Sequence, residues 1–256
     1  MTKATEMTVN EKNEVMNADV PDYIKQWQGQ GRGNENVGAD DIQLPRIEVL
    51  QAISPQTNKR NAEYIDGAEA GMFFNTLTGD LLGESVRVTP INFVTRFLVW
   101  VDRQKDSNGG LRGVFDTEQE ANQFLSTQED AAKLEVVRTA EHLVMFDDGT
   151  TAIVSMSKSK QRASRKWNSL IRLNGGDRFS RSYELFSTEE KSAKGDYISI
   201  DIKNSGYPSK EVYFACEELY TSLQSSPAPR ANYDADIGKE EAPYYDADIV
   251  KEEVPY

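Results

Sequence analysis

The sequence contains very little cysteine and histidine. Its one cysteine, Cys216, can form no intramolecular disulfide and no cysteine-rich zinc site, and it fits a reducing compartment. Its one histidine, His142, stands in the apolar run EHLVMF, where a core or surface imidazole is far more common than a catalytic base. Ser-His-Asp and Cys-His catalysis need a histidine beside the nucleophile. These shortages argue against a disulfide scaffold, a zinc protein and this class of enzyme.

Long apolar runs and phosphate-binding loops are also missing. No stretch of about 18 apolar residues occurs, and the opening MTKATEMTVNEKNEVMNADV lacks the apolar segment of a secretory signal. The glycine-rich GQGRG and NGG lack the strand-turn-helix setting of a phosphate loop. We therefore expect a non-enzymatic cytoplasmic protein with no membrane segment, no cofactor and no metal.

Basic residues are outnumbered by acidic ones in the chain as a whole. Lys and Arg number 29 against 42 Asp and Glu, and the net charge of -13 argues against binding to nucleic acid through overall charge. Residues 157–183 run the other way, because eight cations there accompany one acid, Asp177. Trp167, Phe179 and Tyr183 are interleaved with these cations. The segment is a basic region in an acidic protein.

Cations that follow phosphates, together with rings that stack on bases, are what a single-strand binding groove requires. The candidate nucleic-acid-binding residues are Lys158, Lys160, Arg162, Arg165, Lys166, Arg172, Arg178, Phe179, Arg181 and Tyr183. Trp167 falls on the apolar stripe of its expected helix and is better explained as core. A basic run is also often no more than the solvated face of a helix, so this alternative stays open.

The composition divides the chain into three parts. Residues 1–41 form a polar, acidic leader with one short helix expected in VPDYIKQWQ, and residues 42–224 form a globular body. Residues 225–256 form a linker and a disordered acidic tail. The body is expected to be α+β, a strand-rich single domain built as an OB-like barrel or a curled antiparallel sheet with a few helices.

Hydrophobic periodicity predicts the elements of the body. Two strands are expected within residues 85–102, and a hairpin turn at Asp148-Gly149. Helices are expected over residues 116–125, where Thr117 and Glu120 have capping-box spacing, and over residues 161–173 and 209–223. Extended segments are expected in RFSRSYELF and DYISIDI.

The chain ends on two copies of one dodecapeptide, YDADIGKEEAPY and YDADIVKEEVPY. An acidic C-terminus ending in an aromatic residue resembles the tails of bacterial and phage single-stranded DNA-binding proteins, although here two lysines interrupt the acids and tyrosine replaces the usual terminal phenylalanine. The resemblance implies that the tail docks on replication and repair proteins and competes with DNA for the basic groove. The implied docking residues are Asp246, Asp248, Ile249, Pro255 and Tyr256.

Three stretches of the body, LPRIEVLQAISPQ, GMFFNTLTGDLLG and VWVDRQKDSNGGLRGVF, are similar to phage-encoded proteins associated with DNA replication modules. The expected function is therefore single-stranded DNA binding with little sequence preference during phage DNA replication, recombination or repair. Replication or recombination proteins are the expected partners, and homo-oligomerisation is left open.

Two other functions fit parts of the sequence. The first is a non-enzymatic adaptor or scaffold that acts through its doubled tail. The second, less favoured, is a metal-dependent nuclease, because Asp196, Asp201 and Lys203 in GDYISIDIK have the order acid, acid, lysine along one strand. A solubility role for the tail is also open.

Overall fold

The computed structural model describes residues 33, 44–102, 105–106, 109–192, 195–224, 231 and 233. The chain divides into Met1–Ile42 and Gln43–Tyr256, and the fold described below belongs to the second part. The helix expected in VPDYIKQWQ lies outside the described residues.

Nine strands, three α-helices and four short 3-10 turns make up the described part of the chain. The strands are β1 (Arg46–Val49), β2 (Phe73–Asn75), β3 (Leu81–Gly83), β4 (Ser85–Val101), β5 (Leu111–Phe115), β6 (Leu134–Met145), β7 (Thr151–Ser157), β8 (Tyr183–Ser192) and β9 (Gly195–Asn204). The helices are α3 (Glu118–Thr127), α4 (Gln161–Asn174) and α5 (Lys210–Leu223), and the 3-10 turns are η2 (Pro55–Thr57), η3 (Ala131–Lys133), η4 (Lys158–Lys160) and η5 (Arg178–Ser180).

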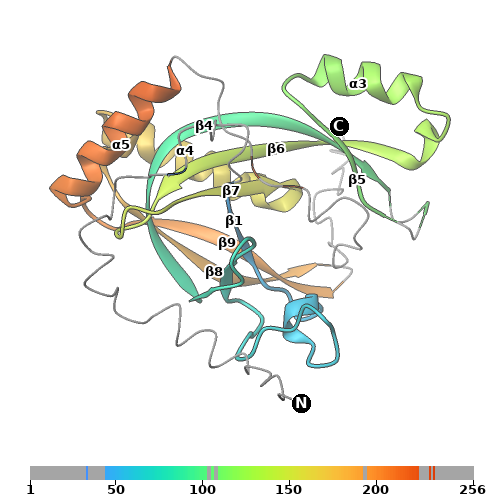
Figure 1. Cartoon of the computed structure of the whole chain (residues 1–256), viewed down its shortest axis with the longest axis horizontal. Coiled ribbons are helices and arrows are strands. Elements are labelled where there is room, and N and C mark those ends of the chain that lie inside the picture. The colour runs from blue at the N-terminus through green and yellow to red at the C-terminus, as the bar shows by residue number, and fades with distance from the viewer. Residues whose placement is uncertain are drawn as a thin grey trace, which may run out of the picture. The chain divides into compact units, whose positions relative to one another are not determined.

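The strands form one curled sheet in the order β3-β2-β1-β7-β6-β4-β8-β9, with β5 added beside β4. The pairing of β1 with β7 is parallel, and the other named strand pairs are antiparallel. Figure 1 shows the long β4 arching across the sheet while β8 and β9 swing away beneath it. The predicted α+β architecture, strand-rich with a curled antiparallel sheet, is confirmed, and the curl is consistent with an OB-like fold.

A glutamine side chain joins the segment after β1 to the edge strand β9. Gln51, two residues after β1, donates from Nε2 to the carbonyl oxygen of Ile198 at 2.9 Å and accepts the Ile198 N–H at Oε1, also at 2.9 Å. Its amide thereby makes the pair of hydrogen bonds that a neighbouring strand would make with β9. The contact links two parts of the sheet that are not neighbours in the strand order.

The segment predicted as two strands is one 17-residue strand, β4. The strand continues through Pro90, which has no N–H to give to a ladder. The structure accommodates Pro90 at a register shift between Pro90 and Asn92 in the pairing with β6, just beyond Val88, where the pairing with β8 ends. The proline therefore stands where one edge of β4 changes partner.

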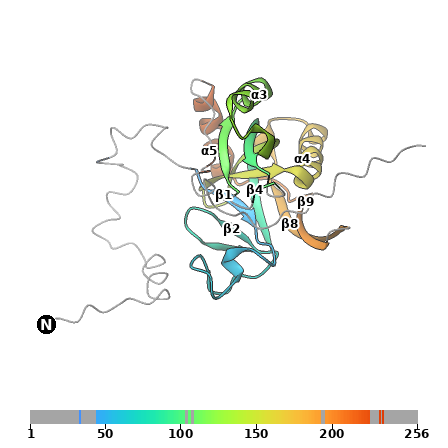
Figure 2. The same ribbon diagram turned by 90° about the vertical axis from the view of Figure 1, so that its right-hand side faces the viewer.

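The two faces of the sheet bury different helices. On β6, Ala140 and Val144 face an inner core that Trp167 of α4 enters, whereas Leu143 and Met145 face a second cluster with Cys216 of α5. This alternation follows the two-residue period of a strand. Helix α3 covers a third cluster at the far end of β4, as Figure 1 and Figure 2 show.

The three predicted helices are confirmed with their local signals. The Thr117 hydroxyl accepts the Glu120 N–H, and the Glu120 carboxylate accepts the Thr117 N–H, both at 3.2 Å, so the capping box forms. Ser209 caps α5 by accepting the Val212 N–H at 3.2 Å. The predicted hairpin turn also forms, with Gly149 at a φ of 85°.

The start of the segment RFSRSYELF differs from its predicted extended form. Arg178–Ser180 forms the 3-10 turn η5, and β8 begins at Tyr183. The turn lets the Phe179 ring leave the line of the strand and enter the cluster beneath α5.

Candidate nucleic-acid interface

Helix α4 presents cations on its exposed face, where Leu173 is also 82% exposed, and buries Trp167 on the other face. Arg162, Arg165, Lys166 and Arg172 are exposed, at spacings that follow the 3.6-residue period of the helix. The buried residues of α4 are Ala163, Ser164 and Trp167. Because its sequence QRASRKWNSLIRLN contains no acid, the exposed face is a stripe of positive charge.

The cations of the stripe differ in whether they form an ion pair. Lys166 donates from Nζ to Asp201 at 2.5 Å. The guanidinium groups of Arg162, Arg165 and Arg172 make no hydrogen bond or ion pair with any residue that the structure describes. These three guanidinium groups are available to an anion in solution.

Two lysines precede the helix in η4. Lys158 pairs with Glu135 at 2.8 Å and has a φ of 47°, a left-handed conformation that is uncommon for a residue with a side chain. Lys160 is half-buried at the residue before α4. Lys158 thus forms an ion pair with an acid on β6, whereas the exposed arginines of α4 form none with a described residue.

The aromatic residues of the basic segment are core residues. Trp167 is fully buried, as the sequence favoured, and its ring stacks on His142 with centroids 4.5 Å apart and planes at 14°. Tyr183 is buried edge-on to Trp167, and its hydroxyl accepts a hydrogen bond from the Asn174 amide at 2.9 Å. Phe179 is buried against α5. Burial of Phe179 and Tyr183 is at odds with base stacking, so neither is kept in the interface proposed below.

Arg178 is also turned inward. Its guanidinium donates to His142 Nδ1 at 2.8 Å and to Asn168 Oδ1 at 3.0 Å, and it lies 5.5 Å from the centre of the Phe93 ring. Burial lowers the pKa of Arg178 to about 10. Arg178 is therefore a structural cation beneath α4.

His142 is held neutral by the same contacts. Burial, reinforced by the Arg178 charge, lowers the pKa of His142 well below its ordinary value. Since a guanidinium has no acceptor, His142 Nδ1 accepts from Arg178, and the Nε2–H donates to the Ser164 hydroxyl at 2.8 Å. The single histidine thus links β6 to α4.

Three aromatic residues outside the basic segment are exposed. The Arg181 guanidinium lies 4.6 Å from the centre of the Tyr207 ring, which is 68% exposed. On α5, Phe214 is 51% exposed, and Tyr220 is 40% exposed and packs on Phe179 with ring centroids 5.8 Å apart. The sequence-based candidates omit these rings. The helical period signalled Phe214, because the apolar stripe predicted for residues 209–223 leaves it on the outer face.

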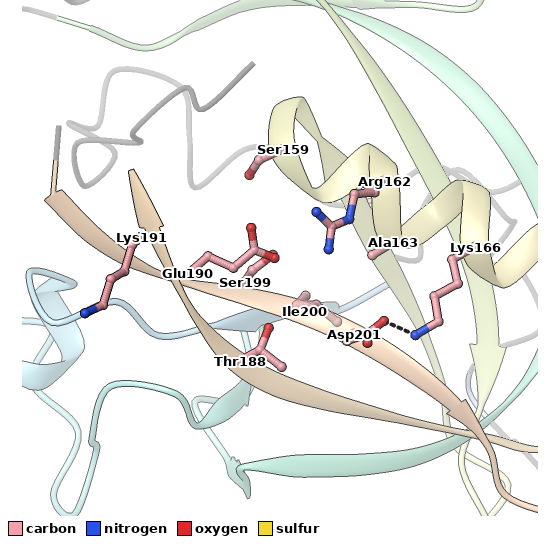
Figure 3. A pocket seen from close by; sticks show the side chains of 10 residues that line it. All are labelled: Ser159, Arg162, Ala163, Lys166, Thr188, Glu190, Lys191, Ser199, Ile200 and Asp201. Atoms are coloured by element: carbon pink, nitrogen blue, oxygen red, sulfur yellow. Dashed lines mark hydrogen bonds and ion pairs between the residues drawn. The ribbon is translucent and has the colours of Figure 1, made fainter. Parts of the chain in front are cut away.

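A groove of about 510 Å³ runs between α4 and the β8–β9 hairpin (Figure 3). Its walls carry cations from both sides, acids from the hairpin and several hydroxyl groups. The lining residues are Ser159, Arg162, Ala163, Lys166, Thr188, Glu190, Lys191, Ser199, Ile200 and Asp201. Of the predicted nucleic-acid-binding residues, the structure brings Arg162 and Lys166 together here.

The two acids of the groove both have partners. Burial tends to raise the pKa of Asp201, but hydrogen bonds from Lys166 and the Ile202 N–H, with the charge of Arg162, outweigh it and lower that pKa. Glu190 accepts a hydrogen bond from the Tyr197 hydroxyl at 2.7 Å. Asp201 is therefore ionised at neutral pH and is the ion-pair partner of Lys166.

The residues of the nuclease hypothesis do not gather in one place. The continuous register of β8 with β9 puts Asp196 and Asp201, five residues apart, on opposite faces of β9. Lys203 pairs with Glu184 at 3.0 Å. Among the described residues, no group of three or more His, Cys, Asp or Glu side chains could hold a metal ion.

The first residue of the tail repeat, Tyr233, is buried in the body. Its hydroxyl donates to Glu141 at 2.5 Å, and the Arg46 guanidinium lies 4.7 Å from the centre of its ring. Ala231, two residues earlier, forms a parallel bridge with Leu44. Burial and the Glu141 carboxylate raise the pKa of Tyr233 well above its ordinary value. Tyr233, the first residue of the repeat, is therefore anchored in the core of the body.

The predicted docking residues Asp246, Asp248, Ile249, Pro255 and Tyr256 lie outside the described residues. Within the part that the structure describes, no helix is long and apolar enough to cross a membrane.

Comparison with known proteins identifies the class of this chain. Residues 10–228, most of the chain, match the model of the Pam3 phage gp34-like protein family. The chain belongs to this family of phage proteins. Comparisons with curated proteins and with solved structures gave no significant match.

Proposed function

We propose that this protein binds single-stranded DNA with little sequence preference in the cytoplasm of an infected cell, during phage DNA replication, recombination or repair. The observation that carries the proposal is a stripe of arginines on α4, a helix without acids. The guanidinium groups of these residues, Arg162, Arg165 and Arg172, have no ion-pair partner among the described residues. Cations spaced along one face contact successive phosphates and read no base, so affinity falls with salt and depends little on sequence.

In this proposal the acidic tail regulates DNA binding by competing with DNA for the basic stripe. Its 24 residues carry eight acids in two copies of one repeat, and the first residue of those copies is anchored on the body through Tyr233. Tethered carboxylates reach an effective concentration on the order of millimolar near the basic stripe, where they compete with phosphates. DNA binding would then release the tail for replication or recombination proteins, with docking through Asp246, Asp248, Ile249, Pro255 and Tyr256.

Fluorescence anisotropy of a labelled oligothymidine tests DNA binding and competition by the tail together. The full chain is compared with a chain that ends at Asp234, at low and moderate salt. The shortened chain keeps Tyr233, because loss of this buried anchor would confuse a change in fold with a change in affinity. We expect salt-sensitive binding that strengthens when the tail is removed.

A full-length chain with the tail acids after Asp234 changed to their amides is the matched control, since it keeps length and anchor while removing charge. It should bind as tightly as the shortened chain. Weaker binding after tail removal contradicts competition by the tail, and no binding by any form contradicts the proposed function.

An adaptor or scaffold is the second candidate. The exposed rings of Tyr207, Phe214 and Tyr220 favour it, because exposed aromatic surface is typical of protein interfaces. Under this hypothesis the stripe on α4 binds an acidic protein, and the α4 arginines are irrelevant to DNA. Replacing those arginines by alanine and measuring oligothymidine binding therefore separates the two functions.

A further inference from the structure

The groove beside α4 has the side chains of a phosphate site, and Asp201 pairs with one of its cations, Lys166. On the helix side, Arg162 and Lys166 are one turn apart and border the groove. On the sheet side, Thr188 pairs in register with Ser199, which places their side chains on the same face of the hairpin as Asp201. Figure 3 shows these groups surrounding one space, with the Lys166–Asp201 contact at its edge.

The cations that line the groove outnumber its acids. Arg162, Lys166 and Lys191 stand against Glu190 and Asp201, which leaves one positive charge without a matching acid in the lining. Lys166 pairs with Asp201, and Glu190 accepts a hydrogen bond from Tyr197, whereas the Arg162 guanidinium makes no hydrogen bond or ion pair with a described residue. The charge of the groove therefore favours an anion beside Arg162.

A phosphodiester matches Asp201 in the features that Lys166 recognises. Both groups carry one negative charge shared by two oxygens, and both accept charge-assisted hydrogen bonds from an ammonium or guanidinium. The phosphodiester also offers its oxygens to the hydroxyl groups of Thr188 and Ser199.

We propose that the groove between α4 and the β8–β9 hairpin is a phosphodiester subsite of the DNA-binding surface, and that Asp201 is an internal substitute which the phosphate displaces from Lys166. This inference rests on the proposed function. It adds a second competitor that acts within the folded body and independently of the tail. Asp201 lowers the affinity for DNA in every form of the protein, including the chain that ends at Asp234.

The test is the isosteric substitution Asp201→Asn in the chain that ends at Asp234, with Asp147→Asn as the matched control. Both remove one negative charge and one ion pair, because Asp147 pairs with Arg87 at the β6–β7 turn, away from the groove. We expect Asp201→Asn to tighten oligothymidine binding about three- to tenfold at low salt, and Asp147→Asn to change it less than twofold. Arg162→Ala added to Asp201→Asn should abolish the gain.

An equal effect of the two substitutions, or no effect of Asp201→Asn on a protein that binds DNA, overturns the subsite and leaves the proposed function standing. If no form binds oligothymidine, the proposed function fails and the subsite is judged by inorganic phosphate. Phosphate at constant ionic strength should then raise the melting temperature of Asp201→Asn more than that of Asp147→Asn. An equal rise overturns the subsite as well.

Discussion

Helices α4 and α5 both cover the curled sheet, but the side chains that they expose to solvent differ in charge and in aromatic content. Helix α4 buries Trp167 and exposes a stripe of cations with no acid, whereas α5 buries Cys216 and exposes Phe214. The exposed side of α5 also carries three glutamates against one lysine. The difference shows that cations and aromatic rings close together in sequence need not share a surface, because the phase of the helix assigns each to a face.

The largest expected effect concerns the buried ring of α4. Trp167→Ala should lower the free energy of unfolding by about 3–5 kcal/mol, because it leaves a cavity beside His142 in the inner core. Phe214→Ala on α5 should lower it by less than about 0.5 kcal/mol, since half of that ring is already in water. Chemical denaturation measures both. Similar losses for the two variants would break the comparison.

The next largest expected effect is a loss of DNA affinity when the arginines of α4 are replaced. Replacing Arg162, Arg165 and Arg172 together by alanine should weaken oligothymidine binding about 10- to 100-fold at low salt. The salt slope should fall by about 2, because each phosphate that a cation neutralises on a single strand adds roughly 0.7 to it. The double variant Phe214→Ala, Tyr220→Ala should stay within about twofold of the natural protein. Anisotropy titrations over a range of salt give both numbers. A larger effect of the α5 variant would move the binding surface to the exposed aromatic rings.

A smaller effect is expected at the anchor of the tail, which belongs to the cluster beneath α5. Tyr233→Phe removes the hydroxyl that donates to the buried Glu141 carboxylate and should lower the free energy of unfolding by about 1–3 kcal/mol. Denaturation of the full chain measures the change. Glu141 keeps its ion pair with the buried Arg96 at 3.5 Å in this variant, so the loss should stay below that of a fully unpaired buried carboxylate. A neutral Tyr233→Phe would mean that the anchor depends on its ring alone.

The smallest effect is a pH dependence from His142 beneath α4. The folded-state pKa of His142 is lowered, so between the unfolded value near 6.5 and the folded value the unfolded chain binds a proton that the folded chain does not. Stability should therefore fall as the pH drops from about 6.5 to 5, by at most about 1.4 kcal/mol per pH unit from this residue. Melting curves across this range should be flatter for His142→Gln, whose amide can still accept from Arg178. An unchanged slope would contradict the neutral, buried imidazole.

Much of the fold followed from local signals. The capping box at Thr117, the hairpin turn at Gly149 and the apolar stripe around Trp167 each depend on a few neighbouring residues, and each formed where predicted. The prediction of two strands within residues 85–102 was wrong, because the alternation of apolar residues does not show where one strand ends and the next begins. Strand β4 continues through Pro90 by a register shift against β6, which only the pairing with that partner reveals.

The candidate site followed from the sequence only in part. The charge of residues 157–183 marked α4, and the period of that helix separated its arginines from Trp167. The burial of Phe179 and Tyr183 depended on α5 and β9, elements that no local pattern joins to the basic segment. The same holds for the exposed Tyr207, which meets Arg181 at the open end of the β8–β9 hairpin.

The sequence by itself determined the cationic stripe of α4, the three helices α3, α4 and α5 and the doubled acidic tail, because periodicity and composition are properties of neighbouring residues. Only the tertiary structure decided that Lys166 meets Asp201, that Gln51 joins the segment after β1 to β9 and that Tyr233 is buried against Glu141. Those contacts join residues 35 to 147 positions apart, and they form only when the curl of the sheet brings the segments together.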